Sequence, residues 1–199
     1  MGEYSFLVVG LGNPGPEYER TPHNMGFLVV DALAAANSIR VVRKENMALV
    51  GLGAIAGKKV VLAKPQTFMN VSGPSVKGLL ERYELQPSQM IVVYDELDLP
   101  WTTLRVKPKG SAAGHNGAKS VIAAAGTMEF PRVRVGIHPG HPIRGMEYVL
   151  APFKRGQQKE LEETVDRARE AVESIIAEGV EKSMTRFNRR AQGLQEEEE

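Results

Sequence analysis

The stretch Phe6-Leu-Val-Val-Gly-Leu-Gly-Asn-Pro-Gly15 decides which class of fold the chain can adopt. Its first five residues are a short apolar run that ends in glycine, which predicts a strand buried on both faces. Residues 10–15, Gly-Leu-Gly-Asn-Pro-Gly, also satisfy G-x-G-x-x-G, the dinucleotide fingerprint. That fingerprint needs a helix to begin immediately after it. Two prolines bracket the last glycine, and the next helical pattern starts only near Asn24. The sequence therefore favours a tight glycine-rich turn, which either is only a turn or directs Asn13 into a pocket.

Outward from this strand, strand and helix patterns alternate along the chain. Further strands are expected at residues 48–55, 59–63, 90–94, 104–107 and 133–137, and helices at 24–36, 72–83, 117–125 and 157–177. Because the strands are apolar on both faces, the sheet should lie buried between helices. The predicted fold is a single-domain, three-layer α/β/α sandwich with a mixed, mostly parallel central sheet. Functional loops in such sheets follow the carboxyl ends of strands.

Composition narrows the possible functions. The 199 residues fit one domain, assigned to residues 1–190, followed by an acidic tail at 191–199 that is expected to be disordered. Without Glu196–Glu199 the formal charge rises from +1 to 25 − 20 = +5, which permits a polyanionic partner without requiring one. The absence of cysteine excludes disulfides, thiolate catalysis and cysteine metal sites. No membrane span and no targeting segment are expected, and the predicted location is the cytoplasm.

His23 and Asp95 form the candidate catalytic pair. His23 stands at the expected start of the helix at 24–36, and Asp95 ends an apolar strand, where packing does not explain a carboxylate. A carboxylate there can accept the Nδ1 proton of the imidazole and leave Nε2 free to take a proton from water. Asp98 could serve in place of Asp95, or cap the next turn. The acidic run at 95–98 could also be a solvated or Mg²⁺-binding loop.

Asn13, Asn70 and Asn116 each lie in a glycine- or proline-containing turn beyond a predicted strand. An amide can donate to a carbonyl oxygen as negative charge develops on it, although asparagine is also a common turn residue. No serine lies in a G-x-S-x-G elbow, so water is the expected nucleophile. His138 and His141 have H-x-x-H spacing, but two prolines and the lack of a third ligand favour a surface turn over a metal site.

Basic residues gather around the last of these turns. Arg105 and Lys107 share a face because they alternate along a strand. Nearby in sequence lie Lys109, Lys119, Arg132 and Arg134. Such a set suits phosphate groups, and a solvated charged face is the equally weighted alternative.

Six motifs combine residues of these kinds. They are Val9-Gly-Leu-Gly-Asn-Pro-Gly15, Tyr18, Thr21-Pro-His-Asn24, Lys64-Pro-Gln-Thr-Phe-Met-Asn70 with Ser72-Gly73, Tyr94-Asp-Glu-Leu-Asp-Leu-Pro100, and Gly114-His-Asn-Gly117. Together they resemble bacterial-type peptidyl-tRNA hydrolase over residues 5–190. The resemblance implies a monomeric cytoplasmic enzyme that hydrolyses the ester between a peptide and the 3′ ribose of tRNA and so recycles the tRNA. It implies no cofactor, metal, membrane or obligate protein partner.

The resemblance also implies roles for individual residues. His23 would be the general base, oriented by Asp95. The substrate would contact Asn13, Tyr18, Phe68, Met69, Asn70, His115 and Asn116. Phosphates of the acceptor stem and 3′ end of tRNA would contact Arg105, Lys107 and Arg134.

Two departures from the family pattern bear on loop geometry. Pro22 stands where the family usually has arginine, and residues 111–113 (Ser-Ala-Ala) replace glycines before His115. Alanine restricts positive φ, so this loop is expected to be stiffer or differently shaped. Two rival functions stay open at this point: a non-catalytic RNA-binding protein on the same fold, and a nucleotide-dependent oxidoreductase.

Overall fold

Strand β1 (Phe6–Gly10) lies inside a seven-stranded sheet in this computed structural model, which describes residues 3–188. The strand order is β2 (Arg43–Glu45), β3 (Ala48–Ile55), β4 (Lys58–Pro65), β1, β5 (Met90–Pro100), β7 (Arg132–His138) and β6 (Leu104–Lys107). The central neighbours β4, β1, β5 and β7 pair in parallel, whereas the pairings at both edges are antiparallel. The predicted mixed α/β sheet is therefore confirmed. The predicted tail at 191–199 lies outside the described residues.

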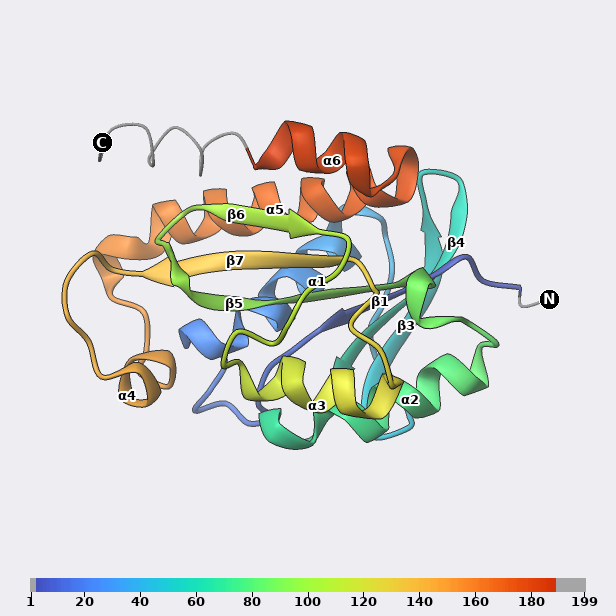
Figure 1. Ribbon diagram of the computed structural model, residues 1–199, viewed down its shortest axis with the longest axis horizontal. Coiled ribbons are helices and arrows are strands. Elements are labelled where there is room, and N and C mark those ends of the chain that lie inside the picture. The colour runs from blue at the N-terminus through green and yellow to red at the C-terminus, as the bar shows by residue number, and fades with distance from the viewer. Residues whose placement is uncertain (1–2, 189–199) are drawn as a thin grey trace.

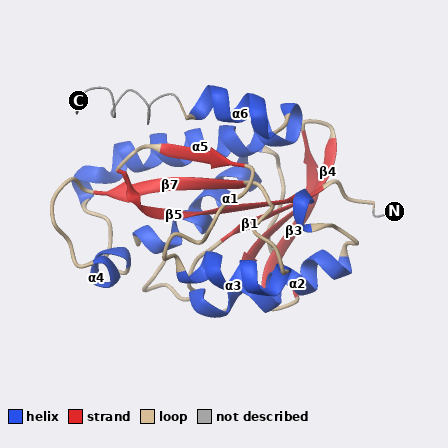
Figure 2. Ribbon diagram, in the orientation of Figure 1, coloured by secondary structure: helices blue, strands red, loops and turns tan. Residues whose placement is uncertain are grey.

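Helices cover both faces of this sheet, as Figure 1 and Figure 2 show. One face carries α1 (Met25–Ala36), α5 (Gln158–Glu178) and α6 (Val180–Phe187), and the other carries α2 (Ser72–Arg82) and α3 (Asn116–Ala125). The short helix α4 (Gly145–Val149) follows β7. Single turns of 3₁₀ helix occur at η1 (Pro22–Asn24), η2 (Met69–Val71), η3 (Pro87–Gln89) and η4 (Arg155–Gln157). None of the helices within residues 3–188 combines the length and apolar content that a membrane crossing needs.

The apolar run of β1 explains why the sheet has two cores. Successive strand residues point to opposite faces, so Leu7 and Val9 pack under α2 and α3, while Val8 packs under α1 and α5. All three side chains are fully buried. Because β1 contributes to both cores, its position fixes the loop that follows it.

The structure lengthens one predicted strand and adds three short elements that were not predicted. Strand β5 continues through Pro100 instead of ending at residue 94, because its second half keeps pairing with β7 after β1 has stopped. The short strand β2 and the short helix α4 carry too few residues for a periodic pattern. Helix α6 was not predicted because Gly179, at φ 92°, separates it from α5.

The end of β1 and the start of α1 meet backbone to backbone. A Cβ atom added at Gly26 would lie 2.4 Å from both the Leu11 nitrogen and the Val93 oxygen, and one added at Gly10 would lie 2.2 Å from the Gly26 oxygen. No side chain fits there without moving the strand or the helix. This contact sets the distance between the β1 loop and η1.

We expect Gly26→Ala to lower the free energy of unfolding by about 1–3 kcal/mol, because the added methyl group must push backbone apart. Urea denaturation monitored by circular dichroism would measure the change. Gly156→Ala is the matched control, since a Cβ there meets nothing within 4 Å, and it should stay within about 0.5 kcal/mol of the parent. Equal stability of the two variants would contradict the close contact.

Candidate active site

The candidate site lies where the sheet loses one of its central strands. Strand β1 pairs with β5 only as far as Gly10 and Val93, so Asp95 stands beyond the last shared pair. The space beside it is filled from both helical layers. His23 comes from η1, directly before α1, and His115 is the residue before α3. Because β1 ends before Asp95, two imidazole rings can reach the same carboxylate.

Asn24 fastens the loop after β1. Its side-chain oxygen accepts the backbone N–H of Asn13 at 2.9 Å, and its Nδ2 group donates to the Asn13 carbonyl, also at 2.9 Å. The fingerprint loop is therefore latched to η1, and no helix opens within residues 11–20. This arrangement confirms that the glycine-rich run is not the start of a dinucleotide-binding helix.

Pro22 is compatible with the position of the neighbouring histidine. It occupies the first turn of η1, where its missing N–H costs nothing, and Thr21 before it is extended at φ −112° and ψ 154°. The departure from the family pattern therefore leaves the backbone at His23 unstrained.

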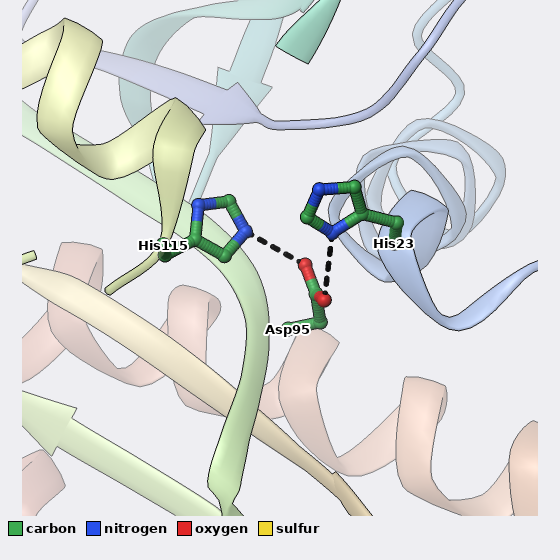
Figure 3. A group of neighbouring side chains, drawn as sticks. All are labelled: His23, Asp95 and His115. Atoms are coloured by element: carbon green, nitrogen blue, oxygen red, sulfur yellow. Dashed lines mark hydrogen bonds and ion pairs between the residues drawn. The ribbon is translucent and has the colours of Figure 1, made fainter. Parts of the chain in front are cut away.

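Asp95 accepts hydrogen bonds from two histidines, as Figure 3 shows. Its Oδ2 atom lies 2.9 Å from Nδ1 of His23, and its Oδ1 atom lies 2.8 Å from Nε2 of His115. The carboxylate is 2% exposed. The predicted contact between His23 and Asp95 is thus confirmed, and Asp98, which is exposed, is not the partner. The second imidazole on the same carboxylate was not predicted.

The tautomer of His115 follows from its surroundings. The backbone N–H of Ala118 donates to Nδ1 of His115 at 3.1 Å, so this nitrogen carries no proton. The proton of the neutral ring is therefore on Nε2, which donates it to Asp95. With one oxygen occupied in this way, Asp95 offers its other oxygen to Nδ1–H of His23. That leaves Nε2 of His23 as the nitrogen able to accept a proton.

The electrostatic balance keeps Asp95 ionised. Burial by itself would raise the pKa of this carboxyl group, but its interactions with His115 and then with His23 outweigh burial and hold the pKa well below its usual range. An ionised carboxylate can steady an imidazolium as it forms, without taking the proton itself.

The same three side chains are the group of described residues whose ligand atoms lie close enough to surround a metal ion, within 4.8 Å of one another. The donor set suits a metal poorly. A metal on Nε2 of His115 would force the ring proton onto Nδ1, where the Ala118 N–H already points. The chemistry of these donors therefore favours a proton-transfer site over a metal site.

Two hollows meet at Asn116. A cavity of about 310 Å³ is lined by His23, Asp95 and Asn116, and its apolar lining includes Leu97, Met146 and Val149. A second, of about 630 Å³, lies over α2 and α3 and is lined by Asn70, Asn116 and Lys119, among others. The structure thus brings two of the three predicted asparagines to one rim.

Close packing holds this rim together. A Cβ on Gly117 would lie 2.4 Å from the sulfur of Met69, so a side chain at position 117 would have to displace the Met69 side chain. Asn13 contributes from beneath, because its side-chain oxygen accepts the Met69 backbone N–H at 2.8 Å. The Asn13 oxygen is therefore occupied, and its Nδ2 group is the part left for a ligand.

The remaining predicted contact residues lie farther out or deeper. Met69 is buried under the rim, and Phe68 is 60% exposed beside it. Tyr18 lies half-buried in the turn before η1, where its carbonyl accepts the Thr21 hydroxyl. Neither Phe68 nor Tyr18 lines either hollow.

The predicted phosphate contacts form a ladder of like charges. On the antiparallel pair β6–β7, Arg105 lies opposite Arg134 and Lys107 lies opposite Arg132. Burial, and after it the charge of neighbouring arginines such as Arg134, lowers the pKa of Lys107 below its usual value. Arg105 and Lys107 are half-buried, whereas Arg134 is 8% exposed and bonds to protein groups. Like charges directly opposite one another destabilise a sheet, so a bound anion would lower the repulsion among these four cations.

Sequence reasoning missed several residues that shape the site. Asn24 was assigned only to a helix start, Glu96 and Leu97 were considered only as part of the acidic run at 95–98, and Met146 was given no role. Leu97 and Met146 line the cavity wall. A latch such as Asn24 leaves no periodic signal, and a wall built from α4 becomes visible only once that helix is placed beside β5.

The fold and the site define an α/β protein with a buried histidine–carboxylate site of the hydrolase type. The family model described as peptidyl-tRNA hydrolase matches residues 7–196. A peptidyl-tRNA hydrolase of Solibacter usitatus is 63% identical over 194 residues, covering 97% of this chain and 99% of that protein. One from Bacillus subtilis is 43% identical over 185 residues, covering 92% and 97%.

The crystal structure of peptidyl-tRNA hydrolase from Acinetobacter baumannii superposes with a TM-score of 0.85 at 34% identity, covering 94% of this chain and 96% of that one. The chain therefore belongs to the peptidyl-tRNA hydrolase family, whose function is hydrolysis of the peptidyl-tRNA ester bond. The resemblance, the fold class and the assignment as an enzyme are confirmed at this level.

We expect Asp95→Asn to destabilise the protein by about 1–3 kcal/mol at pH 7, because an amide can accept only one of the two imidazole N–H groups and turns its NH₂ toward the other. The folded-state pKa is depressed, so the wild-type advantage is complete above the unfolded value of about 3.9. It should shrink as the pH falls toward the folded pKa.

Urea denaturation of both proteins between pH 7 and pH 3 would measure this difference. Asp98→Asn is the matched control, because Asp98 is exposed and should change stability by no more than about 0.5 kcal/mol. An Asp95→Asn penalty that stays constant down to pH 3 would contradict the ionised, doubly bonded carboxylate.

Proposed function

We propose that this chain hydrolyses the ester bond between a peptidyl group and the 3′ ribose of tRNA, with His23 as the general base and water as the nucleophile. One observation carries the assignment: Nδ1 of His23 lies 2.9 Å from the buried Asp95 carboxylate, and the same ring lines a cavity of about 310 Å³. With Nδ1 occupied, Nε2 is the basic nitrogen that a water molecule in the cavity can reach.

The proposed reaction moves one proton through His23. Nε2 takes a proton from water as the water oxygen attacks the ester carbonyl carbon, and Asp95 stabilises the imidazolium that forms. The tetrahedral intermediate then collapses, the bond to the ribose 3′ oxygen breaks, and the imidazolium returns its proton to that oxygen. The products are a peptide carboxylic acid, which loses its proton to the solvent, and a tRNA with its 3′ hydroxyl restored.

Asn116 and Asn70 are the proposed amide donors at the reacting carbonyl. Asn116 lines both hollows, so it stands where an ester placed between them would lie. An amide N–H directed at the carbonyl oxygen strengthens its bond as charge develops there. The Nδ2 group of Asn13 could hold a peptide carbonyl from below, while Tyr18, Phe68, Met69 and His115 would complete the substrate-contacting set.

Arg105 and Lys107 are the proposed contacts to tRNA phosphates, with Arg134 behind them. The support is electrostatic, because four cations face one another across β6 and β7 and an anion lowers their mutual repulsion. We further propose that the enzyme contacts the acceptor stem and 3′ end of tRNA and acts as a monomer in the cytoplasm, where peptidyl-tRNA arises.

We expect His23→Ala to lower kcat on N-acetyl-aminoacyl-tRNA by about 10²–10⁴-fold, since a positioned base contributes about that much. Release of the acetylated amino acid, measured with a chelator present, is the assay. His141→Ala serves as control, because this histidine is exposed in the turn after β7, and it should retain wild-type turnover. Near-normal turnover by His23→Ala would contradict the proposed role of His23 as the general base.

We expect the double variant Arg105→Gln, Lys107→Gln to raise KM for the same substrate. Each lost phosphate contact should flatten the slope of log(kcat/KM) against log[salt] by about 0.7–0.9. Lys182→Gln, an exposed lysine on α6, removes the same charge elsewhere and should leave the slope unchanged. An unchanged slope in the double variant would contradict these phosphate contacts and would mean that the tRNA backbone binds another face of the protein.

A further inference from the structure

Arg134 is more deeply buried than a side chain needs to be to contact a phosphate at the surface. It is 8% exposed, and its guanidinium is bound on three sides by the protein. Nε donates to the Tyr94 hydroxyl at 3.1 Å, Nη2 donates to the Ser111 carbonyl at 2.9 Å, and Nη1 lies 3.7 Å from the Glu96 carboxylate. The planar fork of arginine can reach all three partners at once.

Arg132, two residues before Arg134 on the same face of β7, is also a buried arginine held by protein groups. Its side chain is fully buried, its guanidinium lies 4.1 Å from the centre of the Phe130 ring, and Nη2 donates to the Met128 carbonyl at 2.6 Å. Its Nη1 group lies 3.5 Å from the Ser111 carbonyl, at the outer limit of a hydrogen bond. Two buried cations therefore converge on one backbone oxygen.

That oxygen belongs to the loop that delivers His115 and Asn116. Three residues separate Ser111 from His115, and two of them, Ala113 and Gly114, adopt positive φ, 48° and 80°. The backbone N–H of His115 closes the turn on the Ala112 carbonyl at 3.0 Å. The position of the Ser111 carbonyl therefore sets where this tight turn begins.

Tyr94 links the arginine to the histidine a second time. Its hydroxyl accepts from Arg134, and its ring centre lies 4.8 Å from that of His115. The residue next in sequence is Asp95, which accepts the hydrogen bond from Nε2 of His115. One guanidinium thus contacts both the loop that carries His115 and the aromatic ring on which His115 rests.

We propose that Arg134 is a positioning residue: it fixes the loop of residues 111–115 through the Ser111 carbonyl, so that His115 meets Asp95 and Asn116 faces the cavity. The inference rests on the proposed function, and it gives Arg134 a role distinct from the phosphate contacts of Arg105 and Lys107. An outward movement of Arg134 toward a phosphate would leave Glu96, which is 4% exposed, without its counter-charge. Such a movement is therefore unfavourable.

The test is Arg134→Lys, which keeps the positive charge but replaces the three-sided fork with a single ammonium group. If Arg134 positions the loop, kcat on N-acetyl-aminoacyl-tRNA should fall by about 10–100-fold, as expected when reacting groups shift by a fraction of an ångström. KM and the salt dependence of kcat/KM should stay close to wild type. The imidazole ¹⁵N signals of His115 should also change, because its bond to Asp95 is disturbed.

The opposite pattern would overturn the inference: a raised KM, a flatter salt slope, an unchanged kcat and unchanged His115 signals mark a phosphate contact only. Arg186→Lys, the same change at an exposed arginine on α6, is the control. Should Arg134→Lys fail to fold, Tyr94→Phe removes only the hydroxyl that accepts from Arg134, and it should lower kcat and shift the His115 signals in the same direction. Unaltered kcat and signals in Tyr94→Phe would then contradict the inference.

The outcome also separates this inference from the proposed function. If the wild-type chain releases no acetylated amino acid, the proposed function fails. The His115 signals would still report whether Arg134 holds the loop.

Discussion

A buried carboxylate that accepts hydrogen bonds from two imidazoles is the interaction on which the rest of the site depends. An ionised Asp95 at 2% exposure is tolerated only because both oxygens are bonded. Each bond arrives from a different helical layer, so the carboxylate joins η1, β5 and the start of α3 at one point. A shift of any of these segments would leave a buried charge partly unpaired, and that penalty resists the shift.

The sheet creates the room for this arrangement. Strand β1 stops at Gly10 while β5 runs on beside β7, so the edge of β5 is unpaired on one side where Asp95 stands. The close contact between Gly10 and Gly26 then carries the chain from β1 into α1 at a fixed distance. The Asn24 latch fixes the intervening loop. Packing of backbone on backbone thus determines where the His23 ring lies.

Much of this could be predicted from the sequence, and the exceptions have physical causes. Apolar runs such as Phe6–Gly10 predict buried strands because burial on two faces leaves no alternation, and the predicted meeting of His23 with Asp95 is found at 2.9 Å. The second bond, from His115, could not be predicted because it depends on the tautomer that Ala118 imposes. The contact of Arg134 with a tRNA phosphate, expected from its charge and from the family resemblance, stays a prediction. The enclosure of Arg134 by Tyr94, Glu96 and Ser111 depends on the register of three strands and a loop.

Because side chains alternate between the two faces of β5, its two neighbouring carboxylates can interact with different charged partners. Tyr94 and Glu96 point to the face where Arg134 lies, and Asp95, between them, points the other way. Glu96 lies 3.7 Å from Arg134 and so offsets part of the cationic ladder, while the two histidines bond to Asp95. Burial raises the pKa of Glu96, whereas the bonds to the histidines lower that of Asp95. Neighbouring carboxylates on one strand therefore serve different partners. The pleat of the strand separates the group that balances the cations from the group that orients His23.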